Sequence, residues 1–191
     1  MENICRILIL SSLLIAGTHA ISRELESSKD AENWFRNLSQ RKQKFAKLRF
    51  YIHDALGGPN ATVWEVARAT ITAASPTSFG QVRVLDDLIT AEPDQNSEKL
   101  GRAQGLVTSA DLHEPALAMN LNLVFTAGRY NGSTLCIGGR NPIDTMDREL
   151  PVLGGTGVFR MAGGFSISNI YSYAPVQNYF VWEYVVYVCY V

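Results

Sequence analysis

The chain has 191 residues, of which 47% are hydrophobic and 18% charged, and its 17 basic and 18 acidic side chains give a formal net charge of −1. This length suits one domain with a sizeable core and is too short for two. A near-neutral chain lacks the positive surface that a nucleic-acid backbone requires, so no nucleic-acid partner is expected. The charged fraction is below the usual value of about 25%, and aromatic residues reach 10%. This composition favours β structure with many turns.

The N-terminal segment has the pattern of a secretory signal peptide. Arg6 precedes an apolar run from Ile7 to Ala16, and Thr18-His19-Ala20 places small residues at −3 and −1 of a cleavage site. The apolar run is too short for a membrane span, which needs about twenty apolar residues. We therefore predict a signal peptide over residues 1–20, a secreted mature chain beginning at Ile21, and no membrane span.

Secretion gives meaning to the asparagine and cysteine positions. Three sequons begin at Asn37, Asn60 and Asn131, and we expect some of them to carry N-linked glycans. Once the signal peptide is removed, only Cys136 and Cys189 remain, which allows one disulfide at most and excludes a disulfide scaffold. Whether these two cysteines pair depends on a distance between strands that the sequence leaves open.

Residues 21–47 have the composition of a polar leader outside the core. Trp34, Phe35 and Leu38 form its only cluster of large apolar residues, which is enough for one or two helical turns. The basic run that starts at Arg41 suggests a polyanion site. A solvated, glycosylated leader also explains this run, and we favour that interpretation.

From Leu48 onward, apolar and polar residues alternate with period two, as in strands that bury one face. Turn signals rich in Gly, Pro and Asn separate the runs, and no long helix is indicated. The expected strands are 48–54, 62–73, 81–90, 102–109, 117–126, 133–138, 165–172 and 179–191. This pattern argues for an antiparallel barrel or sandwich. We predict an all-β, eight-stranded antiparallel β-barrel over residues 48–191, because the last run would be an exposed edge unless closure pairs it on both sides.

The side chains needed for metal, nucleotide or hydrolytic chemistry are not apparent. His53 and His113 are the histidines of the mature chain, and neither has a second His or Cys at metal-ligand spacing, so no metal is expected. The glycine run 154–157 lacks the Lys-Ser/Thr of a phosphate-binding loop, so we interpret it as a tight turn between strands. A Gly-x-Ser-x-Gly elbow is also missing. We expect no cofactor and no redox or hydrolytic activity.

One carboxylate stands out as a candidate for proton chemistry. By alternation, Asp54 shares a face with Phe50 and Ile52, and if that face lines the barrel interior, burial raises its pKa and suits it to proton exchange with a bound phenol. Alternatively, Asp54 ends its strand and caps the turn that follows, and the two interpretations have equal weight. Arg148 follows a polar segment that reads as a loop, where a surface arginine is the favoured interpretation.

Several motifs together resemble the plant dirigent proteins. In order along the chain they are Tyr51-Ile-His-Asp54, Gly101-Arg-Ala-Gln-Gly105, Gly132-Ser-Thr134, Gly139-Arg-Asn-Pro142, and Arg148-Glu-Leu-Pro-Val-Leu-Gly-Gly-Thr-Gly157 followed by Phe159-Arg-Met161. The resemblance covers roughly residues 48–191. It implies an eight-stranded barrel of the dirigent and allene oxide cyclase type, a homotrimer, secretion to the apoplast, and one pocket per barrel. It also implies stereoselective coupling of phenoxy radicals, such as those of monolignols, which a separate external oxidase generates.

The resemblance carries site residues over position by position. Asp54 and Arg148 match the pocket acid and base of the family, and we expect them to be catalytic. Asn141 stands where lignan-forming members have a second pocket aspartate, and Val107 and Ser109 stand where those members have pocket tyrosines. These differences resemble the subfamily that includes the pterocarpan synthases, which dehydrate an isoflavanol through a quinone methide.

The resemblance leaves three function hypotheses. The first is a dirigent protein that controls which face of a phenolic radical reacts, and the second is a lyase in which Asp54 moves a proton. The third is a carrier with a lipocalin-like barrel. In lignan-forming members a cysteine near the first strand bridges to the C-terminal one; here Phe45 takes the matching place, and only Cys189 is retained.

Overall fold

The computed structural model describes residues 27–191, which divide into two units after residue 42. The predicted signal peptide lies outside the described residues. In the first unit, residues 27–36 form a helix longer than the one or two turns expected, and the 3-10 turn η1 (Leu38–Gln40) follows. The Arg41 guanidinium lies 5.0 Å from the centre of the Trp34 ring in this unit. Within the described residues, no helix has the length and apolar character needed to cross a membrane.

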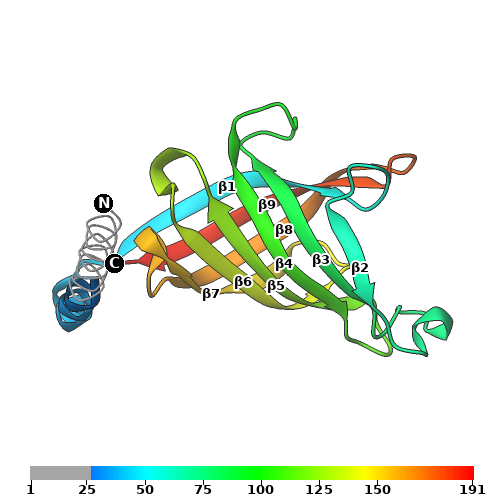
Figure 1. Ribbon diagram of the computed structural model, residues 1–191, viewed down its shortest axis with the longest axis horizontal. Helices are drawn as coiled ribbons and strands as arrows, with labels where there is room; N and C mark the ends of the chain where they lie inside the picture. Colours follow the sequence, from blue (N-terminus) through cyan, green and yellow to red (C-terminus); the bar gives the residue numbers. More distant parts are fainter. Residues whose placement is uncertain (1–26) are drawn as a thin grey trace, which may run out of the picture. The chain divides into compact units, whose positions relative to one another are not determined.

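The second unit is a closed antiparallel sheet (Figure 1). Its strands are β1 (Lys44–Ala55), β2 (Val63–Ala67), β3 (Val82–Thr90), β4 (Lys99–Ser109), β5 (Ala116–Phe125), β6 (Thr134–Pro142), β7 (Arg148–Thr156), β8 (Gly163–Ala174) and β9 (Tyr179–Tyr190). Three 3-10 turns lie between strands: η2 (Thr72–Ala74), η3 (Gly128–Tyr130) and η4 (Gly157–Phe159). The order around the sheet is β1-β9-β8-β7-β6-β5-β4-β3, and β1 also pairs with β3.

The sheet closes because β1 pairs with strands on both of its edges. One edge pairs with β9 along its whole length, starting with Lys44 opposite Tyr190. The other edge pairs with β3 where Ile52 lies opposite Ile89, and the short β2 takes the remaining edge of β3. The closed ring therefore has eight strands, which confirms the predicted fold. It also pairs β9 on both sides, with β1 and β8, and leaves it no exposed edge.

Three features of the strand pattern differ from the sequence-based expectation. β1 begins at Lys44, so residues 44–47, expected in the leader, belong to the barrel. The run 62–73 contains only the short β2, and its remainder forms the turn around η2. β7 was not predicted, because Pro151 and two glycines obscure its alternation; Gly154 and Gly155 lie inside this strand rather than in a tight turn.

Apolar and aromatic side chains fill one end of the barrel. The ring of Phe159 lies 4.8 Å from that of Tyr130 and 5.4 Å from that of Tyr190, measured between ring centres. The adjoining layers consist of fully buried aliphatic side chains: Leu123, Leu135, Ile137, Leu150 and Val186. Because these residues close one end, any cavity inside the barrel lies toward the other.

The two cysteines of the barrel are free thiols. Cys136 is in β6 and Cys189 in β9, and β7 and β8 lie between them in the sheet. Three strand spacings amount to roughly 14 Å along the sheet, whereas a disulfide needs Cα atoms within about 7 Å. Phe45 lies directly opposite Cys189 in the β1–β9 register. The position that holds the bridging cysteine in lignan-forming members is thus next to Cys189, as the resemblance implied, but in this chain it is a phenylalanine.

Candidate functional site

A cavity of about 240 Å³ occupies the end of the barrel opposite the aromatic cluster. Residues of all nine strands and of the adjoining loops line it, since every second residue of a barrel strand points inward. Aliphatic and aromatic side chains form most of the wall: Ile52, Leu56, Val63, Leu85, Ala103, Val107, Leu117, Met119, Leu121, Ile143, Ile170, Phe180, Trp182 and Tyr184. The polar lining residues are Asp54, Arg83, Asp87, Asn141 and Arg148. The cavity therefore combines an apolar body with a few ionisable groups, which is typical of a small-molecule site.

Two of the acids lie side by side. The closure register pairs Ile52 with Ile89 and ends with His53 opposite Leu88, so Asp54 and Asp87 are the next residues beyond the last pair. The two carboxyl groups lie close enough to shift each other's pKa. Asp87 is completely inaccessible to solvent (0% exposed), and its Oδ1 accepts a short hydrogen bond from the Thr62 hydroxyl. The closure of the barrel thus builds a carboxyl pair in the cavity wall.

The environment of this pair favours a shared proton. Burial raises the pKa of Asp54, although hydrogen bonds from Asp87 and Trp182 act in the opposite direction. Burial and the neighbouring charge of Asp54 raise the pKa of Asp87 to about 9. Two carboxylates in contact inside an apolar pocket repel each other strongly, so the pair retains one proton at neutral pH.

Arg148 and Trp182 form the wall beside Asp54. Arg148 is only 4% exposed, and its Cζ lies 4.4 Å from the centre of the Trp182 ring, a cation–π contact. The indole Nε1 of Trp182 donates a hydrogen bond to Asp54 Oδ2 at 2.8 Å. Burial lowers the pKa of Arg148, but guanidinium groups stay protonated in proteins, so its charge persists. The expectation of a surface loop at Arg148 was wrong, because this residue begins β7 and points inward.

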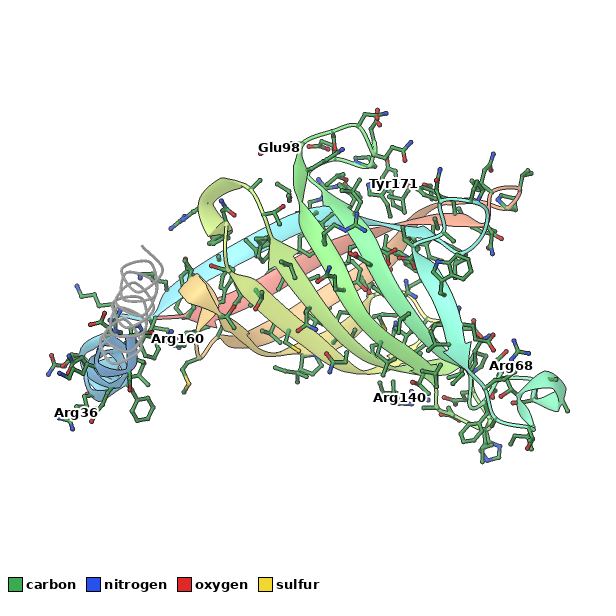
Figure 2. All side chains as sticks on the ribbon, viewed as in Figure 1. Arg36, Arg68, Glu98, Arg140, Arg160 and Tyr171 are labelled. Atoms are coloured by element: carbon green, nitrogen blue, oxygen red, sulfur yellow. The ribbon has the colours of Figure 1, made fainter. Side chains whose placement is uncertain are left out.

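Four buried polar atoms of the described residues have no hydrogen-bond partner, and all four belong to the cavity wall. They are Arg83 Nε, Asp87 Oδ2, Asn141 Oδ1 and Arg148 Nε. Leaving such a group unpaired costs about 1–3 kcal/mol. By contrast, Arg140 on the outer surface, labelled in Figure 2, forms an ion pair. Its Nη2 lies 2.9 Å from Asp111 Oδ2. Unpaired donors and acceptors thus gather where a ligand could satisfy them.

The barrel segment matches a known protein family. The model of the Dirigent-like protein family covers residues 45–189, which is the extent of the barrel. The chain belongs to the dirigent family. Dirigent protein 1 of Arabidopsis thaliana is 40% identical over 146 residues, 74% of this chain and 80% of that protein. Pterocarpan synthase 1 of Glycine max is 37% identical over 152 residues, 79% of this chain and 82% of that protein.

Solved structures agree with the dirigent fold. The structure of the pterocarpan synthase dirigent protein GePTS1 superposes with a TM-score of 0.72 at 36% identity, covering 79% of this chain and 87% of that one. For the pterocarpan synthase dirigent protein PsPTS1 the TM-score is 0.70, again at 36% identity, and the coverage is 78% and 97%. The architecture derived above is therefore that of dirigent proteins.

The dirigent barrel brings together four of the five expected pocket residues. Asp54, Arg148, Asn141 and Val107 all line the cavity. Ser109 does not; it is buried at the end of β4, where its amide bonds to the carbonyl of residue 81. The position at 109 is one alternation step beyond Val107, past the end of the cavity.

The motifs and the alternation pattern did not single out Arg83 and Asp87, or Trp182 with its indole N–H, as cavity residues. The signal for the first two was available, because Arg83, Leu85 and Asp87 alternate along the predicted strand 81–90 and so share one face. Which face pointed inward depended on the closure register. Trp182 lies on the inward face of the last strand, where its indole N–H had no partner that sequence could identify.

A larger groove lies outside the dirigent barrel, at the loops around His53 and Tyr179. Its volume is about 940 Å³, but it is open to solvent. Its principal polar groups already have partners: His53 Nδ1 is 2.9 Å from the Tyr179 hydroxyl, and Nε2 is 2.7 Å from Thr90 Oγ1. The interior cavity, which is more enclosed and has unpaired polar atoms in its wall, is the better candidate for the functional site than this open groove.

Proposed function

We propose that this dirigent protein binds a small phenolic substrate in the barrel cavity and fixes which face of it reacts. The leading form of the proposal is stereoselective coupling of phenoxy radicals, such as those of monolignols, supplied by an external oxidase. The observation that carries it is the apolar cavity inside the barrel in which Asp54 lies beside Arg148 and Asp87. A director of coupling needs to hold its substrate and exclude water, and it needs no redox centre of its own.

The cavity chemistry suits a phenol. Aliphatic side chains such as Leu85, Leu117 and Leu121 offer apolar surface to an aromatic ring. The carboxyl pair can both donate to and accept from a hydroxyl group, because it holds one proton. The unpaired Nε–H of Arg148 can donate to an oxygen that gains negative charge. These contacts fix one orientation of the ring, and a fixed orientation is what stereocontrol requires.

A second candidate function is a lyase reaction of the pterocarpan synthase type. Two observations favour it: the relatives and solved structures that carry this name, and Asn141 in place of an acid in the cavity wall. In this reaction the protonated member of the pair gives its proton to the leaving hydroxyl of a 2′-hydroxyisoflavanol, which departs as water, and the carboxylate member takes the proton of the conjugated phenolic hydroxyl, so that a neutral quinone methide forms. The 2′-hydroxyl then adds to the quinone methide and gives its proton to the carboxylate, while the quinone methide oxygen takes back a proton from the pair.

We further propose that the protein is a secreted, glycosylated homotrimer of the apoplast. The signal-peptide pattern supports secretion, and Asn37, Asn60 and Asn131 are all exposed. Large apolar side chains on the outer surface support association of barrels, among them Trp64, Leu153, Phe165, Tyr171 (labelled in Figure 2) and Tyr173.

Chiral chromatography of products from two substrates tests the proposed function. The secreted protein is given coniferyl alcohol with a one-electron oxidant, and separately a 2′-hydroxyisoflavanol without oxidant. Optically active lignan identifies a coupling director, and ring closure without oxidant identifies a lyase. Racemic coupling products together with unreacted isoflavanol contradict both forms and leave the carrier hypothesis.

A further inference from the structure

Asp87 is the most enclosed ionisable group of the cavity wall and was assigned no role by the family motifs. It is 0% exposed. The preceding residue, Asp86, lies on the outer face, where its Oδ1 is 2.8 Å from Arg102 Nε. One carboxyl oxygen of Asp87 accepts from Thr62, and the neighbouring Asp54 carboxyl raises the pKa of the group. The other oxygen, Oδ2, is buried without a partner.

The unpaired oxygen distinguishes a working acid from a structural one. A carboxyl group that only ties strands together has both oxygens satisfied, because an unpaired buried oxygen lowers stability by about 1–3 kcal/mol. Asp87 lines the cavity, but its Oδ2 is fully covered, so a ligand reaches this oxygen only when a neighbouring side chain moves aside. Thr62 holds the remaining oxygen from the segment before β2, which fixes the orientation of the group.

The charges around the pair are arranged asymmetrically. Asp54 faces Asp87 from β1, and the other charged or titratable groups that act on the pair are Arg83, Arg102, Arg148, Tyr179 and Tyr184. Two arginines, Arg83 and Arg148, lower the pKa of Asp54, and one, Arg102, lowers the pKa of Asp87. With more positive charge acting on it, Asp54 is the better place for the negative charge of the pair, which leaves the shared proton to Asp87.

We propose that Asp87 is a second acid of the dirigent pocket, which holds the proton of the Asp54–Asp87 pair and presents it from Oδ2 to a hydroxyl or carbonyl oxygen of the bound phenolic compound. The identity of the ligand in this inference rests on the proposed function, whereas the position of the proton on Asp87 does not. It also specifies the ligand chemistry: a neutral oxygen that accepts a hydrogen bond at the acid pair. A carboxylate in that place would face the negative charge of Asp54.

The proton assignment is tested on the ligand-free mature protein by NMR titration of aspartate side-chain carboxyl carbons. In the parent chain, Asp87 should remain protonated through neutral pH. In D54N it should lose its proton at a pH lower by on the order of one unit, since the like charge is gone. D86N, which changes the outward neighbour, should leave the Asp87 titration unchanged. An Asp87 that is ionised at pH 7 in the parent chain, or that is unaffected by D54N, overturns the proposal.

The ligand contact is tested by the pH dependence of coniferyl alcohol binding, followed by isothermal titration calorimetry. The affinity of the parent chain is divided by that of D87N at each pH. Ionisation of the phenol itself affects both affinities equally and therefore drops out of this ratio. This ratio should fall as the pH rises through about 9, where the parent pair loses its proton, and a ratio that is constant with pH contradicts the proposed contact. If neither protein binds coniferyl alcohol while the titration shows a protonated Asp87, the proposed function fails and the proton assignment stands.

Discussion

At the scale of single residues, the carboxyl pair couples folding to pH. The folded chain keeps the Asp87 proton up to about pH 9, whereas an unfolded aspartate releases it near its ordinary pKa of about 4. Between these values the folded state binds more protons than the unfolded state. The contribution to stability is therefore complete below about pH 4 and declines as the pH rises toward 9.

The variant D87N removes this dependence, because an amide has no such proton to lose. We expect its free energy of unfolding, relative to the parent chain, to improve with pH by up to about 1.4 kcal/mol per unit between pH values of about 5 and 9. Urea denaturation at several pH values measures the difference. Parallel curves for the two proteins contradict the assigned proton, and D86N serves as the control that should run parallel.

The contact between Arg148 and Trp182 makes a second prediction at this scale. R148K keeps the charge but loses the planar group over the ring and the buried Nε–H that has no partner within the protein. We expect affinity for coniferyl alcohol to fall roughly tenfold, corresponding to about 1.4 kcal/mol. The same exchange at the exposed, ion-paired Arg140 should have no effect on binding. Equal affinities for R148K and the parent chain would return Arg148 to a purely structural role.

At the scale of strands, close backbone contacts decide which glycines tolerate a side chain. A Cβ at Gly164 would lie 2.0 Å from the carbonyl oxygen of Tyr187 in β9, and the residue has a φ of +148°. A Cβ at the adjacent Gly163 would meet nothing within 4 Å. We expect G164A to lower the free energy of unfolding by about 2–4 kcal/mol and G163A to change it by less than about 0.5 kcal/mol. Denaturant titration of the two variants is the measurement, and equal stabilities contradict the tight β8–β9 contact.

Strand by strand, the sequence predicted what alternation controls and missed what closure controls. The face of Asp54 followed from Phe50 and Ile52, and the structure places all three side chains inside. β7 escaped prediction because a proline and two glycines break its pattern, and the position of Arg148 was lost with it. The juxtaposition of Asp54 and Asp87 depends on the register between β1 and β3, which pairs residues far apart in sequence and leaves no local signal.

At the scale of the whole molecule, the boundary of the barrel can be tested by truncation. A chain beginning at Gln43 retains all of β1, whereas one beginning at Leu48 lacks the four residues that pair with the end of β9. The shorter chain also loses two cation–π contacts. They join Lys44 Nζ to the ring centre of Tyr190 at 5.7 Å and Lys47 Nζ to that of Tyr187 at 5.5 Å.

With the natural signal peptide placed before both chains, we expect the longer one to unfold at the same temperature as the parent. The shorter one should lose about 2–4 kcal/mol of stability. Calorimetry of the secreted proteins decides the boundary. If both truncated chains match the parent, residues 44–47 contribute nothing to the barrel and belong with the leader, as alternation alone had suggested.

The central claim is that the phenolic ligand binds inside the barrel, against the Asp54–Asp87 pair and Arg148. A crystal structure of the mature protein soaked with coniferyl alcohol tests it most directly. We predict electron density in the interior cavity, with ligand oxygens within hydrogen-bond distance of Asp87 Oδ2 and of Arg148 Nε. Density in the outer groove beside His53 and Tyr179, with an interior cavity that stays empty at saturating ligand, would contradict the account.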